Sequence, residues 1–186
     1  MRRLLLIFLV LYTHLSFSQN ESLIKQFVID ILKAERPINK GQTVKIKTSL
    51  SKNWPDNFTS SFKANKESCF IKFQRKNHQN DTLVITRKER SQILKFLKQR
   101  NTLDIEKLGV KNVEFTKEEN WSVLTLEWKK YAYLEITKPN FLRNNSIAVC
   151  SEVYLCDANC GYTYFGFYKL IDGKWTQWIP VSNGFF

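Results

Sequence analysis

From Trp121 onward the chain is a succession of short β-strand patterns, and this succession limits the possible folds more than any other feature. Five segments are rich in aromatic and β-branched residues: WSVLTLEW, YAYLEI, SIAVCSEVYL, YTYFGFYKL and KWTQWIPV. The pairs Asn144-Asn145 and Asp172-Gly173 place turn-forming residues between the later segments. Short strands joined by tight turns predict a sheet built from antiparallel hairpins.

Two more strand patterns lie earlier in the chain. Residues 43–50, TVKIKTSL, alternate Val44 and Ile46 against Lys45 and Lys47, which predicts a half-buried strand with lysines on its outer face. The segments CFIKFQRK, from Cys69, and TLVIT, at 82–86, flank the polar turn NHQND and predict a hairpin.

Two helices are expected beside the sheet. Residues 22–35 carry apolar side chains at i, i+4 spacing and end before Pro37, because the residue preceding a proline leaves the helical region. Thr86 and Glu89 form a capping box that opens a second helix reaching about Arg100. Its apolar side holds Ile93, Leu94 and Leu97, and its opposite side holds Lys88, Lys95 and Lys98. The predicted fold class is α+β: an antiparallel sheet with an N-terminal amphipathic helix and a second, basic helix, stapled by a disulfide.

The first 18 residues have the pattern of a secretory signal peptide. Arg2 and Arg3 precede an apolar run over residues 4–11, and Ser16 and Ser18 occupy the −3 and −1 positions of a cleavage site. The run is shorter than the roughly 20 residues that a membrane span needs. We therefore expect a signal peptide over residues 1–18 and a single globular α+β domain over 19–186, exported to the periplasm or secreted.

Positive charge is concentrated in the middle of the chain. Residues 19–186 carry 27 basic and 17 acidic side chains, and residues 63–100 alone carry 11 Lys and Arg against three acidic residues. Clustered cations attract phosphates and acidic glycans, although such a face can also serve only for solubility. The candidate anion-binding residues are Arg75, Lys76, Arg87, Lys88, Lys95 and Lys98.

Four cysteines in an exported chain favour disulfides. An extended segment would hold Cys150 and Cys156 about 20 Å apart, which is beyond disulfide reach. Cys156 can meet Cys160 where the intervening DAN segment turns the chain back, so this pair is predicted. Cys69 and Cys150 are then left either as a second disulfide or as two buried, reduced thiols.

The C-terminal region, residues 136–179, resembles the C-terminal part of small exported proteins of Bacteroidota. In those proteins a KPxF segment leads through a strand to a Cys- and Gly-rich corner, an aromatic strand, a GKW turn and a closing Trp-Ile strand. One departure is Asp157, where similar proteins have glycine after the first cysteine. Asp81-Thr82-Leu83 also resembles the periplasmic O-glycosylation site of that phylum. The resemblance implies a fold element and an exported location, but no activity. The matching residues are Lys138, Pro139, Phe141, Cys156, Cys160, Gly161, Gly173, Lys174, Trp175, Trp178 and Ile179.

The aromatic segment YTYFGFYKL predicts two different faces. Tyr162, Tyr164 and Tyr168 share one face, and Phe165 and Phe167 point to the other. Phe on the core side and Tyr at a half-wet surface suit a sheet that is covered on one side. A tyrosine platform for stacking sugars or bases is the functional alternative.

No catalytic or metal centre is indicated. Beyond residue 18 the one histidine, His78, lies in a polar turn, and the chain has no CxxC, GxSxG or HExxH motif. Nothing singles out two of the strand carboxylates as a hydrolytic pair; these are Glu127, Glu135, Glu152 and Asp157. We therefore expect a protein that is not an enzyme and that needs no cofactor.

These observations favour a non-catalytic binding module for anionic envelope or extracellular material, such as an acidic glycan, a lipid head group or an envelope protein, and not nucleic acid. One alternative is an assembly or inhibitor protein of the envelope. The other is a hydrolase with unidentified carboxylates.

Overall fold

The computed structural model describes residues 21–33, 43–47, 70–74, 81–99, 103, 105–110, 113–116, 130–157 and 160–185, with residues 70–74, 157 and 185 described as backbone only. Several predicted features lie outside these residues: the signal peptide, the strand at 121–128, Cys69, Arg75, Lys76, His78 and Glu127. Within the described part of the chain, no helix is long and apolar enough to cross a membrane.

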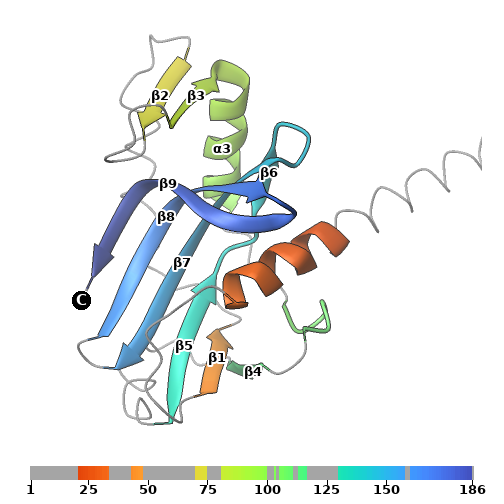
Figure 1. The fold of residues 1–186 in the computed structure, drawn as a ribbon, viewed down its shortest axis with the longest axis vertical. Coiled ribbons are helices and arrows are strands. Elements are labelled where there is room, and N and C mark those ends of the chain that lie inside the picture. The colour runs from red at the N-terminus through yellow and green to blue at the C-terminus, as the bar shows by residue number, and fades with distance from the viewer. Residues whose placement is uncertain are drawn as a thin grey trace, which may run out of the picture.

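The described strands form one large sheet and one hairpin (Figure 1). The sheet has seven strands in the order β4-β1-β5-β7-β8-β9, and β6 also pairs with β7. Its strands are β1 (Thr43–Lys47), β4 (Glu114–Thr116), β5 (Tyr131–Ile136), β6 (Asn140–Leu142), β7 (Ile147–Asp157), β8 (Cys160–Ile171) and β9 (Lys174–Phe185). The separate hairpin pairs β2 (Phe70–Gln74) with β3 (Thr82–Thr86). The helices are residues 21–33 and α3 (Arg87–Gln99).

The sheet is mixed, which corrects the prediction of a wholly antiparallel one. β5, β7, β8 and β9 pair in antiparallel fashion, as the turn residues predicted. β1, however, runs parallel to both of its neighbours, β4 and β5. No short turn joins β1 to either neighbour in sequence, so the local turn chemistry carried no information about this pairing.

Turn residues of the predicted kind join the later strands. Asp172 and Gly173 have φ values of 49° and 75°, and both are positive as a two-residue type I′ hairpin turn requires. Asn144 and Asn145, with φ values of 52° and 62°, lie in the turn between β6 and β7. Asparagine adopts this left-handed conformation more readily than most residues.

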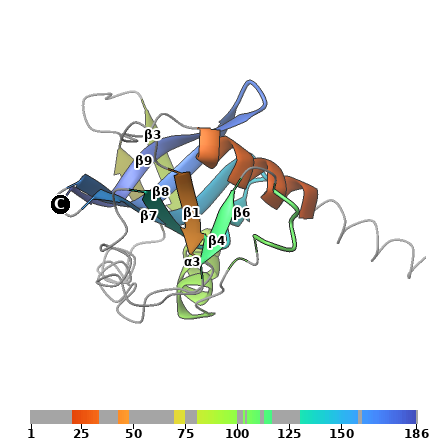
Figure 2. The same ribbon diagram turned by 90° about the horizontal axis from the view of Figure 1, so that it is seen from below.

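The helix of residues 21–33 covers one face of the sheet (Figure 2). Ile24, Phe27 and Val28 are buried against Leu134 of β5 and Tyr168 of β8. The ring of Phe27 lies 5.1 Å from that of Tyr168, edge to face. The helix is also tied to β9, because Asp30 Oδ2 accepts a hydrogen bond of 2.9 Å from the Trp175 backbone N–H.

The β2–β3 hairpin and α3 lie on the opposite face. Leu83, Ile93 and Leu97 are buried together with Phe165 and Phe167 of β8. Alternate residues of β8 therefore enter two different cores, one on each side of the sheet.

Most of the tyrosine face is buried, which differs from the predicted half-wet surface. Tyr168 is wholly buried and Tyr164 nearly so, because the helix of residues 21–33 covers this face, whereas Tyr162 is half-buried. The assignment of Tyr and Phe to opposite faces is nevertheless what the structure has. Two of the three rings are buried and cannot stack on a ligand, so the platform of three tyrosines is wrong. Trp175 and Trp178 offer no such platform either, since they are buried on opposite faces.

Lys47 is buried, although its alternation with apolar residues predicted an outer position. Its Nζ lies 3.2 Å from Glu135 Oε2, and both side chains are 0% exposed. Tyr131, Tyr133 and Leu155 form an apolar cluster on this same side of β5 and β7. The ion pair allows a lysine to occupy a buried position in an alternating strand.

Of the cysteines that the structure describes, two form a disulfide and one is a free thiol. A disulfide joins Cys156 to Cys160, with Cα atoms 5.2 Å apart, where β7 turns back into β8. Cys150 is a free, buried thiol, so it does not form the second disulfide that was one of the two alternatives. Its Sγ lies 3.3 Å from the backbone oxygen of Thr137.

Candidate anion-binding face on helix α3

Helix α3 begins where the capping box predicted. Glu89 N–H donates to Thr86 Oγ1 at 3.2 Å, and Thr86 N–H donates to Glu89 Oε2 at 2.8 Å. These reciprocal hydrogen bonds satisfy two backbone donors that a helix start would otherwise leave without partners. They fix the first residue of α3 as Arg87 and so set the angular position of every cation that follows.

Contacts from the β6–β7 turn hold the start of α3 on the sheet. Arg143 Nε donates to Glu89 Oε1 at 2.8 Å, and a second guanidinium nitrogen donates to the backbone oxygen of Val84. One turn later, Gln92 Nε2 donates to Asn140 Oδ1 at 3.3 Å. α3 is therefore attached through polar contacts at its sides as well as through its apolar side.

The apolar side of α3 packs against the sheet. Ile93 and Leu97 lie in the core with the β8 phenylalanines, and burial of each such side chain contributes about 1.5–3 kcal/mol. This packing leaves the opposite side of the helix facing outward. The exposed cations there, which we call the α3 basic face, are Arg87, Lys88, Lys95 and Lys98.

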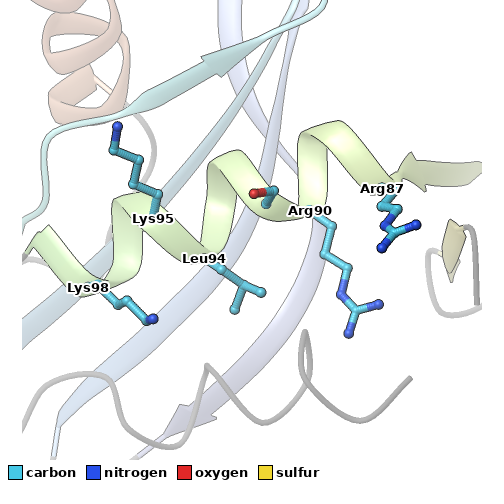
Figure 3. Close-up of a pocket in the computed structure, with 6 residues that line it drawn as sticks. Arg87, Arg90, Leu94, Lys95 and Lys98 are labelled. Carbon is cyan, nitrogen blue, oxygen red and sulfur yellow. The ribbon is translucent and has the colours of Figure 1, made fainter. Parts of the chain in front are cut away.

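Two open hollows lie along this part of α3. One, of about 430 Å³, is lined among the described residues by Arg87, Arg90, Ser91, Leu94, Lys95 and Lys98. The other, of about 720 Å³, is lined by Arg87, Lys88, Ser91, Gln92 and Lys95. Figure 3 shows Arg87, Arg90, Leu94 and Lys98 on one side of the helix ribbon, with Lys95 extending to the other side. Both volumes fall within the range of small-molecule sites.

Negative charge on α3 is kept away from the α3 basic face. Glu89 is the one acidic residue of the helix, and it is engaged by Arg143 and Thr86. Partial burial tends to raise the pKa of Glu89, but hydrogen bonds from Arg143 and Thr86 outweigh burial and lower this pKa below its usual value of 4.5. Within the described residues, none of the four basic-face cations forms an ion pair. The face therefore presents positive charge that α3 itself does not neutralise.

The predicted site residues are only partly brought together. Arg87, Lys88, Lys95 and Lys98 share the exposed part of α3, whereas Arg75 and Lys76 lie outside the described residues. Four lining residues were missed: the buried Arg90, together with Ser91, Gln92 and Leu94. Each lies three or four residues from a predicted cation, and this helical spacing was the signal available in the sequence.

Glu135 and Glu152, the two of the four strand carboxylates whose side chains the structure describes, do not form a catalytic pair. Glu135 lies on the same side of the sheet as Lys47, whereas Glu152 lies on the side covered by the helix of residues 21–33. Glu152 Oε1 accepts a hydrogen bond of 2.9 Å from Tyr162 Oη and another from Gln177 Nε2. The two carboxylates are thus separated by the sheet itself and cannot act on one bond.

The buried thiol offers no nucleophile. Burial raises the pKa of Cys150 to about 12, and the Glu152 carboxylate acts in the same direction. A thiol with that pKa remains protonated near neutral pH, and its complete burial keeps external substrates away, so Cys150 is not poised as a nucleophile. Among the described residues, no group of three His, Cys, Asp or Glu side chains could hold a metal ion.

Comparisons of the chain with protein-family models, with curated proteins and with solved structures found no match.

Proposed function

We propose that this protein is a non-catalytic binding module that holds anionic material on helix α3. The observation that carries the proposal is the α3 basic face: four exposed cations on one helix, with the single acidic residue of that helix paired elsewhere. In this proposal α3 is a basic amphipathic helix whose apolar side serves the fold and whose charged side serves the ligand.

The chemistry of the face favours compact anionic groups. Lys and Arg side chains bind phosphate, sulfate and carboxylate groups through charge-assisted hydrogen bonds. α3 has one aromatic residue, Phe96, and it is partly buried against the core. The helix therefore lacks an exposed ring on which a nucleic-acid base could stack.

The same proposal places the anionic material outside the cytoplasm. It is supported by the signal-peptide pattern of residues 1–18 and by the Cys156–Cys160 disulfide, since disulfides persist mainly in oxidising compartments. An envelope or extracellular ligand follows from this location.

Salt elution from a phosphate-bearing resin tests the proposal. The variant Arg87→Gln/Lys95→Gln/Lys98→Gln removes three charges from α3. A matched control, Lys33→Gln/Lys138→Gln/Lys174→Gln, removes three exposed charges from other elements. We expect the α3 variant to elute at clearly lower salt than both the control and the parent protein, because local cation clusters dominate such binding.

Equal elution of the α3 variant and the control would refute the proposal, because only net charge would then matter. Circular dichroism and thermal unfolding of both variants check that the substitutions leave the fold intact. All of these side chains are exposed, so we expect changes in unfolding free energy of about 0.5 kcal/mol or less.

A further inference from the structure

The two hollows on α3 share a boundary. Arg87, Ser91 and Lys95 line both of them, whereas Lys98 lines the smaller hollow and Lys88 the larger one. Arg87, Ser91 and Lys95 follow one another at intervals of four residues, so they are neighbours along the helix surface. The boundary between the hollows is therefore a line of two long side chains with the short, exposed Ser91 at its centre.

Ser91 is the low point of this boundary. Its side chain extends much less far from the helix than those of Arg87 and Lys95, which lie on either side of it. These two cations are eight positions apart, which is about 12 Å along the axis of a helix. A ligand can therefore pass from one hollow to the other over Ser91. Joined in this way, the two hollows form one open groove along the outer side of α3, which we call the α3 groove.

Exposed cations lie on both sides of the α3 groove. Arg87 and Lys98 lie on one side of the helix ribbon, and Lys95 extends to the other side (Figure 3). Lys88 precedes Lys95 by seven positions and so lies near the same side as Lys95, because residues one heptad apart are nearly aligned on a helix. From Arg87 to Lys98 the groove is about 16 Å long, since these residues are eleven positions apart.

This arrangement suits a ligand with several anionic groups. On one side of the groove, Arg87 and Lys98 are about 16 Å apart along the helix axis, and on the other side Lys88 and Lys95 are about 10 Å apart. A small anion that contacts one of these cations therefore lies away from the second cation of the same side. All four cations are used together by a ligand that carries anionic groups along its length, since linked groups bind at a high effective concentration.

Resting on the proposed function, we propose that the ligand of α3 is a linear acidic polysaccharide, whose sugar chain lies lengthwise in the α3 groove and passes over Ser91. Its sulfate, phosphate or carboxylate groups pair with Arg87 and Lys98 on one side and with Lys88 and Lys95 on the other, through charge-assisted hydrogen bonds. The short side chain of Ser91 lets the sugar chain approach the helix between these cations.

The residues of the groove favour a polysaccharide over two other anionic materials. A helix that lies in a lipid interface inserts large apolar residues, but the large hydrophobic side chains exposed in the described part of the chain are Val84 and Ile171, and neither belongs to α3. Proteins that bind single-stranded nucleic acid stack its bases on aromatic side chains. Among the described residues that line the two hollows, none is aromatic.

Isothermal titration with sulfated saccharides tests whether one ligand occupies the whole groove. The probes are a heparin disaccharide, a heparin octasaccharide and inorganic sulfate, all compared per sulfate group at the same low salt concentration. We expect the octasaccharide to bind about tenfold or more tightly than the disaccharide, because it alone reaches cations at both ends of the groove. Inorganic sulfate is expected to bind most weakly.

Two uncharged substitutions at one position test the path over Ser91. Ser91→Gln fills the low point of the boundary without changing the net charge, so we expect it to weaken octasaccharide binding about fivefold and to leave disaccharide binding nearly unchanged. The matched control Ser91→Ala adds no bulk and is expected to bind both saccharides like the parent protein. Alanine and glutamine favour a helix at least as well as serine, so both variants keep α3.

Equal binding of the octasaccharide and the disaccharide per sulfate group would overturn the linear ligand but leave anion binding by α3 intact. Equal octasaccharide affinities of Ser91→Gln and Ser91→Ala would overturn the path over Ser91. Tighter binding of a single-stranded oligonucleotide, or of vesicles of an anionic phospholipid, would assign the face to that material instead. If no saccharide binds, the inference fails; the proposed function fails as well if the triple α3 variant also elutes like its control from the phosphate resin.

Discussion

The buried ion pair between Lys47 and Glu135 makes a quantitative test of the fold possible. The substitution Lys47→Met removes one charge and leaves a side chain of similar length. Glu135 then remains as a carboxylate in a position that is 0% exposed. Removing the cation that lies 3.2 Å from a buried carboxylate is among the few single changes that destabilise a domain severely.

The expected magnitude follows from the separation and the burial. At 3.2 Å and an effective dielectric constant near 20, the Coulomb attraction between the charges is about 5 kcal/mol. Desolvation of both groups offsets most of this attraction in the native protein, but the desolvation of Glu135 remains after its partner is removed. We therefore expect Lys47→Met to lower the free energy of unfolding by about 3–5 kcal/mol.

The double variant Lys47→Met/Glu135→Leu distinguishes the cost of the buried charge from the cost of changing the side-chain shapes at these two positions. Replacing both partners with apolar side chains also removes the buried carboxylate and its desolvation cost, so most of the lost stability returns. Lys45→Met is the control on the same strand, because Lys45 lies 4.0 Å from a half-exposed Glu114 and stacks on Tyr131 at 3.3 Å. Its loss of stability is expected to be about 1 kcal/mol.

Urea unfolding followed by tryptophan fluorescence measures five proteins: the parent, Lys47→Met, Glu135→Leu, the double variant and Lys45→Met. With a slope of about 2 kcal/mol per molar urea, Lys47→Met lowers the midpoint by roughly 2 M. A midpoint for Lys47→Met within about 0.5 M of the parent would refute the reasoning, because it would mean that water reaches the pair. A double variant as unstable as the sum of the singles would refute it too, since the two sites would then be independent.

Two smaller predictions concern α3 and the sheet. Glu89→Gln lowers stability by about 1 kcal/mol at neutral pH. Because the folded pKa of Glu89 is depressed, its contribution is present above 4.5 and is lost as pH falls through the folded value, so parent and variant converge in acid unfolding curves. If Glu89→Gln were still less stable than the parent at about pH 3, this prediction would be contradicted. Gly166→Ala places a Cβ 2.5 Å from the Ile179 carbonyl oxygen and 2.7 Å from Tyr164 Oη, and lowers the free energy of unfolding by about 1–3 kcal/mol. Gly184→Ala, which meets its nearest side chain at 3.3 Å, is the milder control, and an equal loss there would contradict the packing argument.

The local parts of the fold could be predicted because each depends on residues close in sequence. The start of α3 follows from Thr86 and Glu89, which bond to each other across three residues. The turn between β8 and β9 follows from Asp172 and Gly173, which adopt the positive φ values that their types tolerate. The Cys156–Cys160 disulfide follows from the reach of a short turn.

The remaining features depend on which segments meet far along the chain. The parallel pairing of β1 with β5 joins residues that are almost 90 positions apart, and no local residue type marks it. Burial of Lys47 depends on Glu135 of that same neighbour, so the alternating pattern alone gave the wrong face. Burial of Tyr168 depends on Phe27, a residue of a helix that the sequence could predict but could not place.

The same contrast between local features and contacts of distant segments applies to the α3 basic face, of which only the local part could be predicted. The spacing of Arg87, Ser91 and Lys95 is already present in the sequence, and it indicates one line of the helix surface. Whether that line faces solvent depends on Ile93 and Leu97 reaching the phenylalanines of β8 more than 60 residues later. Arg143 then holds Glu89 aside, so the one carboxylate of α3 does not neutralise the face. The sequence supplies the cations, and these distant contacts direct them outward and keep them available to an anion.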